Sequence, residues 1–377
     1  MNFHFDQDEQ DVLDMLHDFC LKEVAPIAAE IDETERFPEE TWHKLADMGM
    51  MGIAYPEEVG GAGMSYVTYI GACEELAKHC ATTSVMVSAH SSLCCWPISE
   101  YGTEAQKEKY LSKLCSGEWL GAFGLTEPGA GTDAAMQKTV AEDKGDHWVL
   151  NGSKIFITNA GFANVFVVFA MTDKSLGTKG ISAFIVERDF PGFKVGSHEK
   201  KMGIRGSSTC ELVFEDCIVP KENLLGEIGK GFKIAMTTLD GGRIGIGAQA
   251  LGIAQAAIDE CVKYTKERVQ FGKRISQFQN TQFQLADMQA KLDGARLLIY
   301  RAAQAKQDHE PYSHLAAMGK LMASEVASDV TRRALQLVGG YGYTREYPFE
   351  RFMRDAKITE IYEGTSEVQR MVISGWM

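Results

Sequence analysis

The chain lacks the cysteine patterns of a disulfide-bonded or zinc-binding protein. Its nine cysteines are an odd number, and no two of them form a C-x-x-C pair. Disulfide frameworks and structural zinc sites use paired, regularly spaced cysteines. We therefore predict free thiols, no metal site and a reducing compartment, which we take to be the cytoplasm.

Positive charge and long apolar runs are also scarce. The net charge of -14 disfavours a general binder of nucleic acid or of anionic membranes. No run approaches the roughly 20 apolar residues that cross a bilayer. The N-terminal segment 1–20 is acidic, unlike the basic start of a signal peptide or an Arg-rich transit peptide. We expect a mature protein from its first residue, with no nucleic-acid and no membrane partner.

Two common nucleotide-binding patterns are missing as well. No G-x-G-x-x-G stands between a strand and a helix, which disfavours a doubly wound fold. The glycine-rich segment 56–64 has no strand before it and no Lys-Ser/Thr after it, so a connecting loop is favoured over a P-loop. The 377 residues, 45% apolar and 24% charged, are an ordinary globular composition and suffice for two or three domains.

Hydrophobic periodicity divides the chain into three parts. Both ends carry apolar residues three and four apart, which is typical of amphipathic helices. The middle consists of short β-branched and aromatic runs, with no helix long enough for a parallel crossover. We predict an α+β protein with a helical domain at 1–119, an antiparallel β-barrel or sandwich at 120–228 and a C-terminal four-helix bundle at 229–377.

Three local patterns give further expectations. Asn151-Gly152 between two β-type runs predicts a hairpin. Residues 82–95 contain no Lys or Arg and predict a buried helix, in which His90 is a hydrogen-bonded core histidine rather than a metal ligand. Apolar residues every four positions predict the buried face of a bundle helix at Met318, Met322, Val326 and Val330.

The segment DAKITEIYEGTSEVQR, residues 355–370, holds a carboxylate at a break between two helices. Glu363 stands between an aromatic residue and a glycine, and the hydroxyls that follow can cap a new helix with a negative charge in its first turn. A turn between rigid elements is a common place for a catalytic base; a solvated helix end is the alternative. The neighbours concerned are Tyr362, Gly364, Thr365, Ser366 and Glu367.

Two segments of the middle part have residue types that suit a ligand. LTEPGAGTD, residues 125–133, has glycines that free backbone N–H groups for an anion or a ring oxygen. KIFITN, residues 154–159, places Phe156 and Thr158 on one face of a strand, where a planar ring can stack and accept a hydrogen bond. A Pro-Gly turn and a plain core strand are the respective alternatives.

Two segments of the C-terminal part also have residue types that suit a ligand. KYTKERVQFGKR, residues 263–274, carries five basic residues, and its Arg268 suits a phosphate. QLVGGYGY, residues 336–343, has three glycines at a helix end, which permit close approach of backbone to a ligand. A solvated face and an ordinary helix C-cap are the alternatives.

Taken in this order, these segments resemble the acyl-CoA dehydrogenase family over essentially the whole chain. The matching stretches are LTEPGAGTD, KIFITN, ERVQFGK, QLVGGYGYTREYPFERFMRDAKI and IYEGTSEVQ. Among subgroups, the chain is most similar to the short-chain, butyryl-CoA type of anaerobic bacteria. The resemblance implies an enzyme that binds FAD without a Rossmann fold, between the β domain and the C-terminal helices, and oxidises an acyl-CoA to the trans-2-enoyl-CoA.

The resemblance also implies that Glu363 is the base that removes the α-proton of the thioester while the β-hydride passes to the flavin N5. Its backbone N–H, with a flavin ribityl hydroxyl, is expected to bind the thioester oxygen, and burial by the acyl chain to raise its pKa. One branch of the family carries its base where this chain has Gly242. The segment 82–92 lacks the arginine of members that take dicarboxylic substrates. Substrate-side positions match Thr132, Asp240, Arg243, Tyr362 and Gly364.

Cofactor positions carry over from the same resemblance. Contacts to the flavin ring and pyrophosphate match Leu125, Thr126, Gly131 and Thr132. Phe156 and Thr158 match the residues that pack on the ring and bond near N5, although many members have tryptophan in place of the phenylalanine. Residues that reach the FAD of a neighbouring subunit match Arg268, Phe271 and Gln279, and further contacts to its ADP part match Gln336, Gly339 and Gly340, with Thr365 and Glu367 nearby.

Sharing a cofactor between subunits implies an obligate homo-oligomer, in this family usually a tetramer. The resemblance further implies electron exchange with an electron-transferring flavoprotein and a place in fatty acid metabolism. The flavin potential and the partner set the direction of the reaction, so a reductase of enoyl-CoA or aryl-acryloyl-CoA is the alternative. A non-catalytic acyl-CoA-binding protein is a remote alternative, which the intact Glu363 and flavin motifs disfavour.

Overall fold

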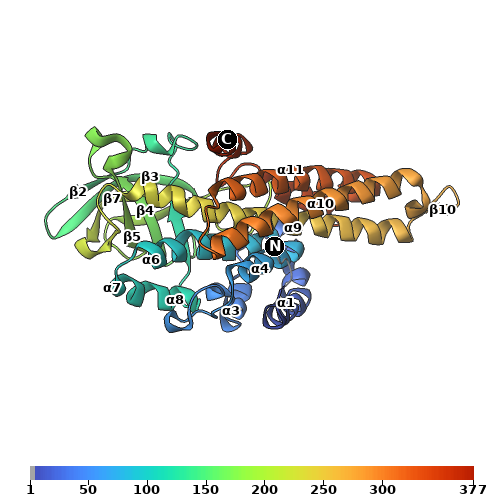
Figure 1. Ribbon diagram of the computed structural model, residues 1–377, viewed down its shortest axis with the longest axis horizontal. Helices are drawn as coiled ribbons and strands as arrows, with labels where there is room; N and C mark the ends of the chain where they lie inside the picture. The colour runs from blue at the N-terminus through green and yellow to red at the C-terminus, as the bar shows by residue number, and fades with distance from the viewer. Residues whose placement is uncertain (1–4) are drawn as a thin grey trace.

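The computed structural model describes residues 5–377 and has helices on both sides of a middle β-sheet in chain order (Figure 1). The sheet lies at one end of an elongated molecule, and the long C-terminal helices extend from it to the β10 hairpin at the other end. The predicted α+β architecture, helical then β then helical, is confirmed. Within the described residues no helix is long and apolar enough to cross a membrane.

The N-terminal part is a set of short helices with recognisable ends. Asp6 accepts the N–H of Glu9 and forms a capping box at the start of α1. Gly49 follows α3 with a φ of +74°, a conformation that glycine adopts without a steric cost. The helices are α1 Gln7–Phe19, α2 Ala28–Thr34, α3 Glu39–Asp47, α4 Tyr66–His79, α5 Ala81–Ser88, α6 Trp96–Tyr101, α7 Glu104–Gln106 and α8 Ser112–Cys115.

The predicted buried helix over residues 82–95 is confirmed. It consists of α5 and a π-helical turn, Ala89–Cys95, and all its residues are buried. One ring nitrogen of His90 accepts the N–H of Gly121 at 2.9 Å, and the other lies 3.0 Å from the carbonyl of Leu114. His90 is therefore the hydrogen-bonded core histidine that the sequence predicts. All nine cysteines, which lie within the described residues, are free and buried.

The middle part folds as one sheet with the strand order β6-β7-β3-β2-β4-β5-β8. Its neighbours pair antiparallel as predicted, with two exceptions. β1 pairs β4 parallel over four residues, and β2 touches β4 through one parallel bridge. The connection from β1 to β4 runs through the β2–β3 hairpin rather than through a helix, and this crossover has no helical signal. The strands are β1 Gly121–Gly124, β2 Val140–Asp143, β3 His147–Ile157, β4 Val165–Met171, β5 Ile181–Glu187, β6 Phe193–His198, β7 Cys210–Pro220 and β8 Leu224–Leu225.

The hairpin predicted at Asn151-Gly152 is wrong. Both residues lie inside β3, which continues through them between β2 and β7. The register against β7 shifts between Leu150 and Gly152, so the glycine marks a β-bulge. A Cβ on Gly152 would collide with Thr139, which explains why glycine stands there. The same dipeptide chemistry suits a bulge and a tight turn, and only tertiary pairing distinguishes them.

β4 joins two cores because both of its faces are buried. Val165, Val167 and Phe169 pack with helical residues in one cluster. Phe166 and Val168 face the other way, into a cluster made of the strands themselves. The continuous apolar run VFVVFAM is typical of such a two-sided strand. This packing fixes the sheet against the π-helical turn and the first part of α9.

The C-terminal part is built from long helices that share a core with the N-terminal part. α9, α10 and α11 pack on one another, α13 packs on α9 and α11, and α4 lies against α9. Their lengths place functional residues far apart, since an α-helix rises 1.5 Å per residue. The elements are α9 Gly231–Glu267, α10 Gln279–Gln307, α11 Ser313–Val338, α12 Gly340–Tyr343, α13 Phe349–Ile358 and α14 Ser366–Trp376, with the small strands β9 Val269–Gln270 and β10 Lys273–Arg274.

The predicted buried stripe on α11 is partly wrong. Val326 and Val330 are buried, but Met318 is half-buried and Met322 is 44% exposed. A spacing of four drifts around a helix of 3.6 residues per turn, so the stripe leaves the core. The buried face instead carries small residues and one lysine: Ala316, Gly319, Lys320, Ala323, Ala327 and Ala334.

Candidate active site

Glu363 lies on a tight turn between α13 and α14. Its φ is +52° and that of Gly364 is +93°, so both residues adopt the left-handed region. A non-glycine residue there costs on the order of 1 kcal/mol and persists only where its surroundings hold it. Thr365 caps α14 by accepting the N–H of Val368, as predicted. The alternative of a solvated helix end is wrong for this carboxylate, because its Oε2 is shut off from solvent.

Two buried side chains hold this turn by donating to the same carbonyl oxygen. The Nζ of Lys320 lies 2.7 Å from the Gly364 oxygen. The Nε2 of Gln369 lies 2.8 Å from the same oxygen and 3.3 Å from the carbonyl oxygen of Glu363. Lys320 and Gln369 are both completely buried. These contacts fix the direction of the Glu363 side chain.

The Glu363 carboxylate points at α9, where Gly242 faces it. A Cβ on Gly242 would lie far inside 3.0 Å of Oε2 and 2.8 Å from a Leu93 methyl group. Only a glycine leaves room for the carboxylate at this point. Position 242, where one branch of the resembled family carries its base, has no side chain here, and the Glu363 carboxylate occupies the space that such a side chain would need.

Burial raises the pKa of Glu363 from 4.5 to about 7. The positive charges of Lys320 and Arg243 oppose this rise. Among the described residues Oε2 has no hydrogen-bond partner. A buried carboxylate with a free oxygen and a pKa near neutrality can accept a proton from a bound molecule.

The other residues predicted on the substrate side form polar contacts at α9. Arg243 and Asp240 form an ion pair, and Ser313 donates to Asp240 at 2.9 Å. Burial raises the pKa of Asp240 even beside this arginine. The Tyr362 hydroxyl donates to the buried side chain of Gln249. The structure therefore brings together the predicted residues Asp240, Arg243, Tyr362, Glu363 and Gly364.

The predicted loop 125–133 of the β domain is held from behind by a buried ion pair. The Nζ of Lys154 lies 2.7 Å from Glu127 and 3.2 Å from the carbonyl oxygen of Leu125. Burial lowers the pKa of Lys154 to about 8. Burial also opposes ionisation of Glu127, but the charge of Lys154, together with hydrogen bonds from Thr139 and Lys138, outweighs it and the pKa of Glu127 is lowered. Both groups are charged at pH 7, and the pair anchors the loop to β3.

The outer side of this loop is open. Gly131 and Thr132 are exposed, Thr126 is half-buried, and Leu125 is buried. No atom lies within 4 Å of where a side chain on Gly129 or Gly131 would stand, so the backbone there is accessible to a ligand. The loop therefore offers N–H and hydroxyl donors on a fixed support.

Phe156 lies beside this loop, because the N–H of Ile155 donates to the carbonyl of Thr126 at 2.9 Å. It is 60% exposed, and its φ of +60° is unusual for an aromatic residue. Thr158 is half-buried two residues on, and Asn159 donates to the Met86 carbonyl of α5 at 3.0 Å. An exposed aromatic ring can stack on a flavin ring, and hydroxyl and free N–H groups can donate hydrogen bonds to the flavin and its phosphates. These residues therefore fit FAD.

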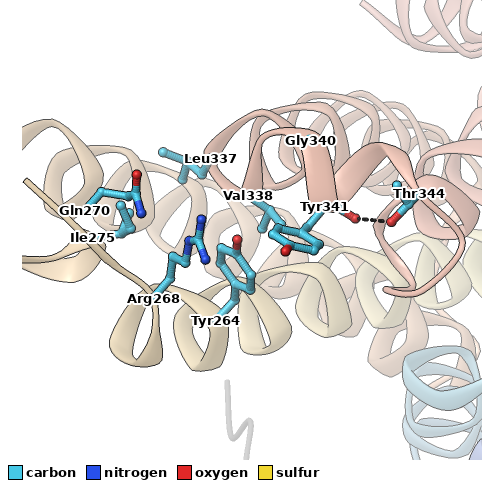
Figure 2. Close-up of a pocket in the computed structure, with 9 residues that line it drawn as sticks. All are labelled: Tyr264, Arg268, Gln270, Ile275, Leu337, Val338, Gly340, Tyr341 and Thr344. Carbon is cyan, nitrogen blue, oxygen red and sulfur yellow. Dashed lines mark hydrogen bonds between the residues drawn. The ribbon is translucent and has the colours of Figure 1, made fainter.

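The second predicted cofactor group lies elsewhere, at the far end of the long helices. Arg268 and Gly340 line a pocket of about 450 Å³, which Figure 2 shows. The Arg268 guanidinium stands over the Tyr341 ring at 5.5 Å. The other residues that line the pocket are Tyr264, Gln270, Ile275, Leu337, Val338, Tyr341 and Thr344. Four predicted cofactor residues do not line it but are exposed on the adjoining elements: Phe271, Gln279, Gln336 and Gly339.

Two members of that predicted group lie with Glu363 instead. Thr365 is the cap of α14, and Glu367 is exposed in its first turn. Arg243, near Glu363, and Arg268 are separated by most of α9, roughly 37 Å along its axis. Within one chain the predicted Arg268 group therefore lies far from Glu363.

A separate cluster joins α1 to α4. The Nδ1 of His17 lies 2.6 Å and the Nε2 of His79 2.9 Å from the same oxygen of Glu75. These distances are those of hydrogen bonds, so one ring nitrogen of each imidazole is paired with the carboxylate. The three groups also lie close enough to share an ion.

The sequence reasoning missed Lys154, Gln249, Lys320 and Gln369. Each is a buried polar side chain, and on β3, α9 and α11 most of the other buried residues are apolar or small, whereas α14 buries only Ser366 and Gln369. A lone lysine or glutamine within such a run is the signal that would have found them, because buried polar groups require a partner.

Comparison with known proteins agrees with this geometry. Family models match the acyl-CoA dehydrogenase N-terminal domain at residues 6–118, middle domain at 122–217 and C-terminal domain at 229–377. The short-chain specific acyl-CoA dehydrogenase of Clostridium acetobutylicum is 60% identical over 375 residues, which cover 100% of this chain and 99% of that protein.

Solved structures are equally similar. The butyryl-CoA dehydrogenase of Megasphaera elsdenii superposes with a TM-score of 0.98 at 54% identity, covering 100% of this chain and 99% of its own. A chain from a structure of the electron transferring flavoprotein of Acidaminococcus fermentans, studied for flavin-based electron bifurcation, has a TM-score of 0.98 at 55% identity, covering 99% and 98%. This chain belongs to the acyl-CoA dehydrogenase family.

Proposed function

We propose that this chain is an FAD-dependent short-chain acyl-CoA dehydrogenase that converts an acyl-CoA to the trans-2-enoyl-CoA. The observation that carries the proposal is the buried Glu363 carboxylate, which has a free oxygen and a pKa near 7. Relatives at more than half identity include short-chain specific and butyryl-CoA dehydrogenases.

Glu363 acts as the base in this proposal. Its Oε2 takes the α-proton of the thioester. The backbone turn at Gly364 directs this carboxylate toward α9. A pKa of about 7 leaves roughly half of the carboxylate ionised at pH 7, near the optimum for a general base. The buried walls at Gly242 and Leu93 exclude water and keep the carboxylate reactive.

FAD, when bound, supplies the acceptor for the β-hydride. Phe156 and Thr158 would hold its ring, and the loop 125–133 would donate to the ring and pyrophosphate through exposed N–H and hydroxyl groups. The Lys154–Glu127 pair keeps this loop in place. The Arg243–Asp240 pair at the side of Glu363 would orient the CoA arm.

The distance between Glu363 and the Arg268 group supports a homo-oligomer, and we propose a tetramer. Roughly 37 Å of helix is longer than an extended FAD, so the Arg268 group would serve the cofactor of a neighbouring copy. Its pocket combines a cation, an aromatic wall and open glycine backbone, which suits the ADP part of FAD.

We further propose that the electrons pass to an electron-transferring flavoprotein, in short-chain fatty acid metabolism in the cytoplasm. The similarity to a chain from the Acidaminococcus fermentans flavoprotein structure supports this partner. Nine free, buried cysteines are those expected in a reducing compartment.

Anaerobic titration of the purified yellow protein with butyryl-CoA tests the function. We expect the flavin absorbance to bleach, and a panel of acyl chains from four to sixteen carbons to bleach it progressively less well. Failure of every acyl-CoA to bleach the flavin would overturn the proposal.

A further inference from the structure

Lys320 is a fully buried lysine that the reaction as described does not use. It lies on the face of α11 that otherwise carries small residues such as Gly319 and Ala323. Among the described residues the carbonyl oxygen of Gly364, at 2.7 Å, is the only hydrogen-bond partner of its Nζ. Burying an ammonium group with one partner is unfavourable, so a compensating charge should lie near it.

That charge is the Glu363 carboxylate, one residue from the carbonyl that Lys320 binds. Burial lowers the pKa of Lys320 to about 8, and Glu363 is the strongest influence that opposes this fall. In return, Lys320 is the strongest influence that opposes the rise of the Glu363 pKa. In the part of the chain that the structure describes, Lys320 forms no ion pair within 4 Å, and the carboxylates of Asp240 and Glu360 are paired with Arg243 and Lys357 instead.

The other titratable groups that face Glu363 do not supply an unpaired positive charge. Arg243 of α9 is cationic, but it is paired with Asp240. On α4 and beside the turn, burial raises the pKa values of the hydroxyl and thiol groups, which are therefore neutral: Tyr66, Cys73 and Tyr362. Lys320 on α11 is the cation that lowers the Glu363 pKa most, and the carboxylates of Glu360 and Glu367 act on Lys320 more weakly than Glu363 does.

We propose that Lys320 is a positioning residue that fixes the Glu363 turn and holds the Glu363 carboxylate ionised in its buried site. The inference rests on the proposed dehydrogenation, in which an ionised Glu363 is needed before the α-proton can leave. The lysine does not touch the substrate-facing Oε2. It acts through the carbonyl of Gly364 and through its charge.

Gln369 offers a matched control because it donates to the same oxygen without a charge. Its Nε2 lies 2.8 Å from the Gly364 oxygen, compared with 2.7 Å for Lys320. Lys320→Met removes a donor and a charge, whereas Gln369→Met removes only a donor. The two variants therefore separate the electrostatic part of the proposal from loosening of the turn.

The first experiment measures the rate of flavin reduction by butyryl-CoA in a stopped-flow instrument between pH 5.5 and 9.5. We expect Lys320→Met to move the midpoint of the pH profile up by about one unit, so that the rate falls about fivefold at pH 7 and recovers near pH 9. Gln369→Met should lower the rate at every pH without moving the midpoint. An unmoved midpoint in Lys320→Met, or an equal movement in Gln369→Met, would overturn the proposal.

The second experiment needs neither turnover nor a folded Lys320 variant. The titration of Lys320 is followed by NMR in lysine-labelled wild type and in Glu363→Gln. Removing the carboxylate should lower the Lys320 pKa below its wild-type value of about 8. An unchanged Lys320 pKa refutes the coupling. If wild type shows this coupling but no acyl-CoA bleaches its flavin, the proposed function fails while the Lys320–Glu363 relationship stands.

Discussion

The Oε2 atom of Glu363 occupies the space that a side chain on Gly242 would need. The two residues lie on different elements, Glu363 on the turn before α14 and Gly242 on α9. Their contact makes the glycine a condition for the position of the carboxylate. A side chain at position 242 and the Glu363 carboxylate cannot occupy the same space, so this chain has room for only one base at this point.

Gly242→Ala should therefore push Glu363 out of place while the fold survives, because the clashing atom is the end of a flexible side chain. We expect flavin reduction by butyryl-CoA to slow at least tenfold, with FAD retained. Gly294→Ala is the control: it lies on α10 with no atom within 4 Å of the new methyl group. The control should reduce flavin at the wild-type rate and be stabilised by up to about 1 kcal/mol. Equal rates in both variants would contradict this account.

The raised pKa of Glu363 also predicts a pH-dependent stability. Between pH 4.5 and about 7 the folded protein binds the Glu363 proton more tightly than the unfolded chain, so this group lowers stability as the pH rises. Glu363→Gln removes that effect. The free energy of unfolding of the variant minus that of wild type should be larger at pH 8 than at pH 4.5, by at most about 3 kcal/mol. Thermal unfolding at the two pH values measures it, and a difference that does not change with pH would rule out the burial argument.

Lys154→Met should destabilise the β domain, because it leaves Glu127 buried without its cation. Breaking a buried pair costs about 3–5 kcal/mol. We also expect faster loss of FAD on gel filtration, since the pair anchors the loop 125–133. The double variant Lys154→Met/Glu127→Gln should recover part of the stability. If the double variant is less stable than the single one, the pair is not the anchor.

Arg268→Ala should weaken FAD binding although it lies far from Glu363. The guanidinium is the cation of the Arg268 pocket (Figure 2). We expect at least a tenfold rise in the FAD dissociation constant, measured by flavin fluorescence, and a smaller particle in analytical ultracentrifugation. Lys266→Ala removes an exposed cation at the end of the same helix and should change neither. Unaltered FAD affinity in Arg268→Ala would remove the case for a shared cofactor.

Local patterns predicted the elements better than their partners. The turn at Glu363, the buried stretch 82–95 and the three-part order follow from capping residues, missing charges and periodicity, all of which act within a few residues. The Asn151-Gly152 hairpin failed because strand pairing with β7 turns the same dipeptide into a bulge. Lys320 and Lys154 went unrecognised because burial of a lysine depends on a partner from another element.

The separation of the cofactor residues is a further limit of sequence reasoning. Phe156 and Arg268 both lie in motifs that suit a ligand, and only the resemblance to the family, not the spacing of the residues, implied that Arg268 serves a neighbouring subunit. The length of α9 supports that placement, since it puts Arg268 roughly 37 Å from Arg243, which lies beside Glu363. The candidate residues were thus predicted one by one, and the proposed sharing of the cofactor between two copies rests in addition on the fold.

The central claim, that Glu363 is the base of an acyl-CoA dehydrogenase, is tested most directly by single-turnover reduction of the FAD-loaded Glu363→Gln variant with butyryl-CoA. The glutamine keeps the shape of the side chain but cannot take a proton. The account predicts that the variant binds butyryl-CoA, seen as a perturbed flavin spectrum, and reduces its flavin at least a thousandfold more slowly than wild type. Flavin reduction at the wild-type rate in this variant would contradict it.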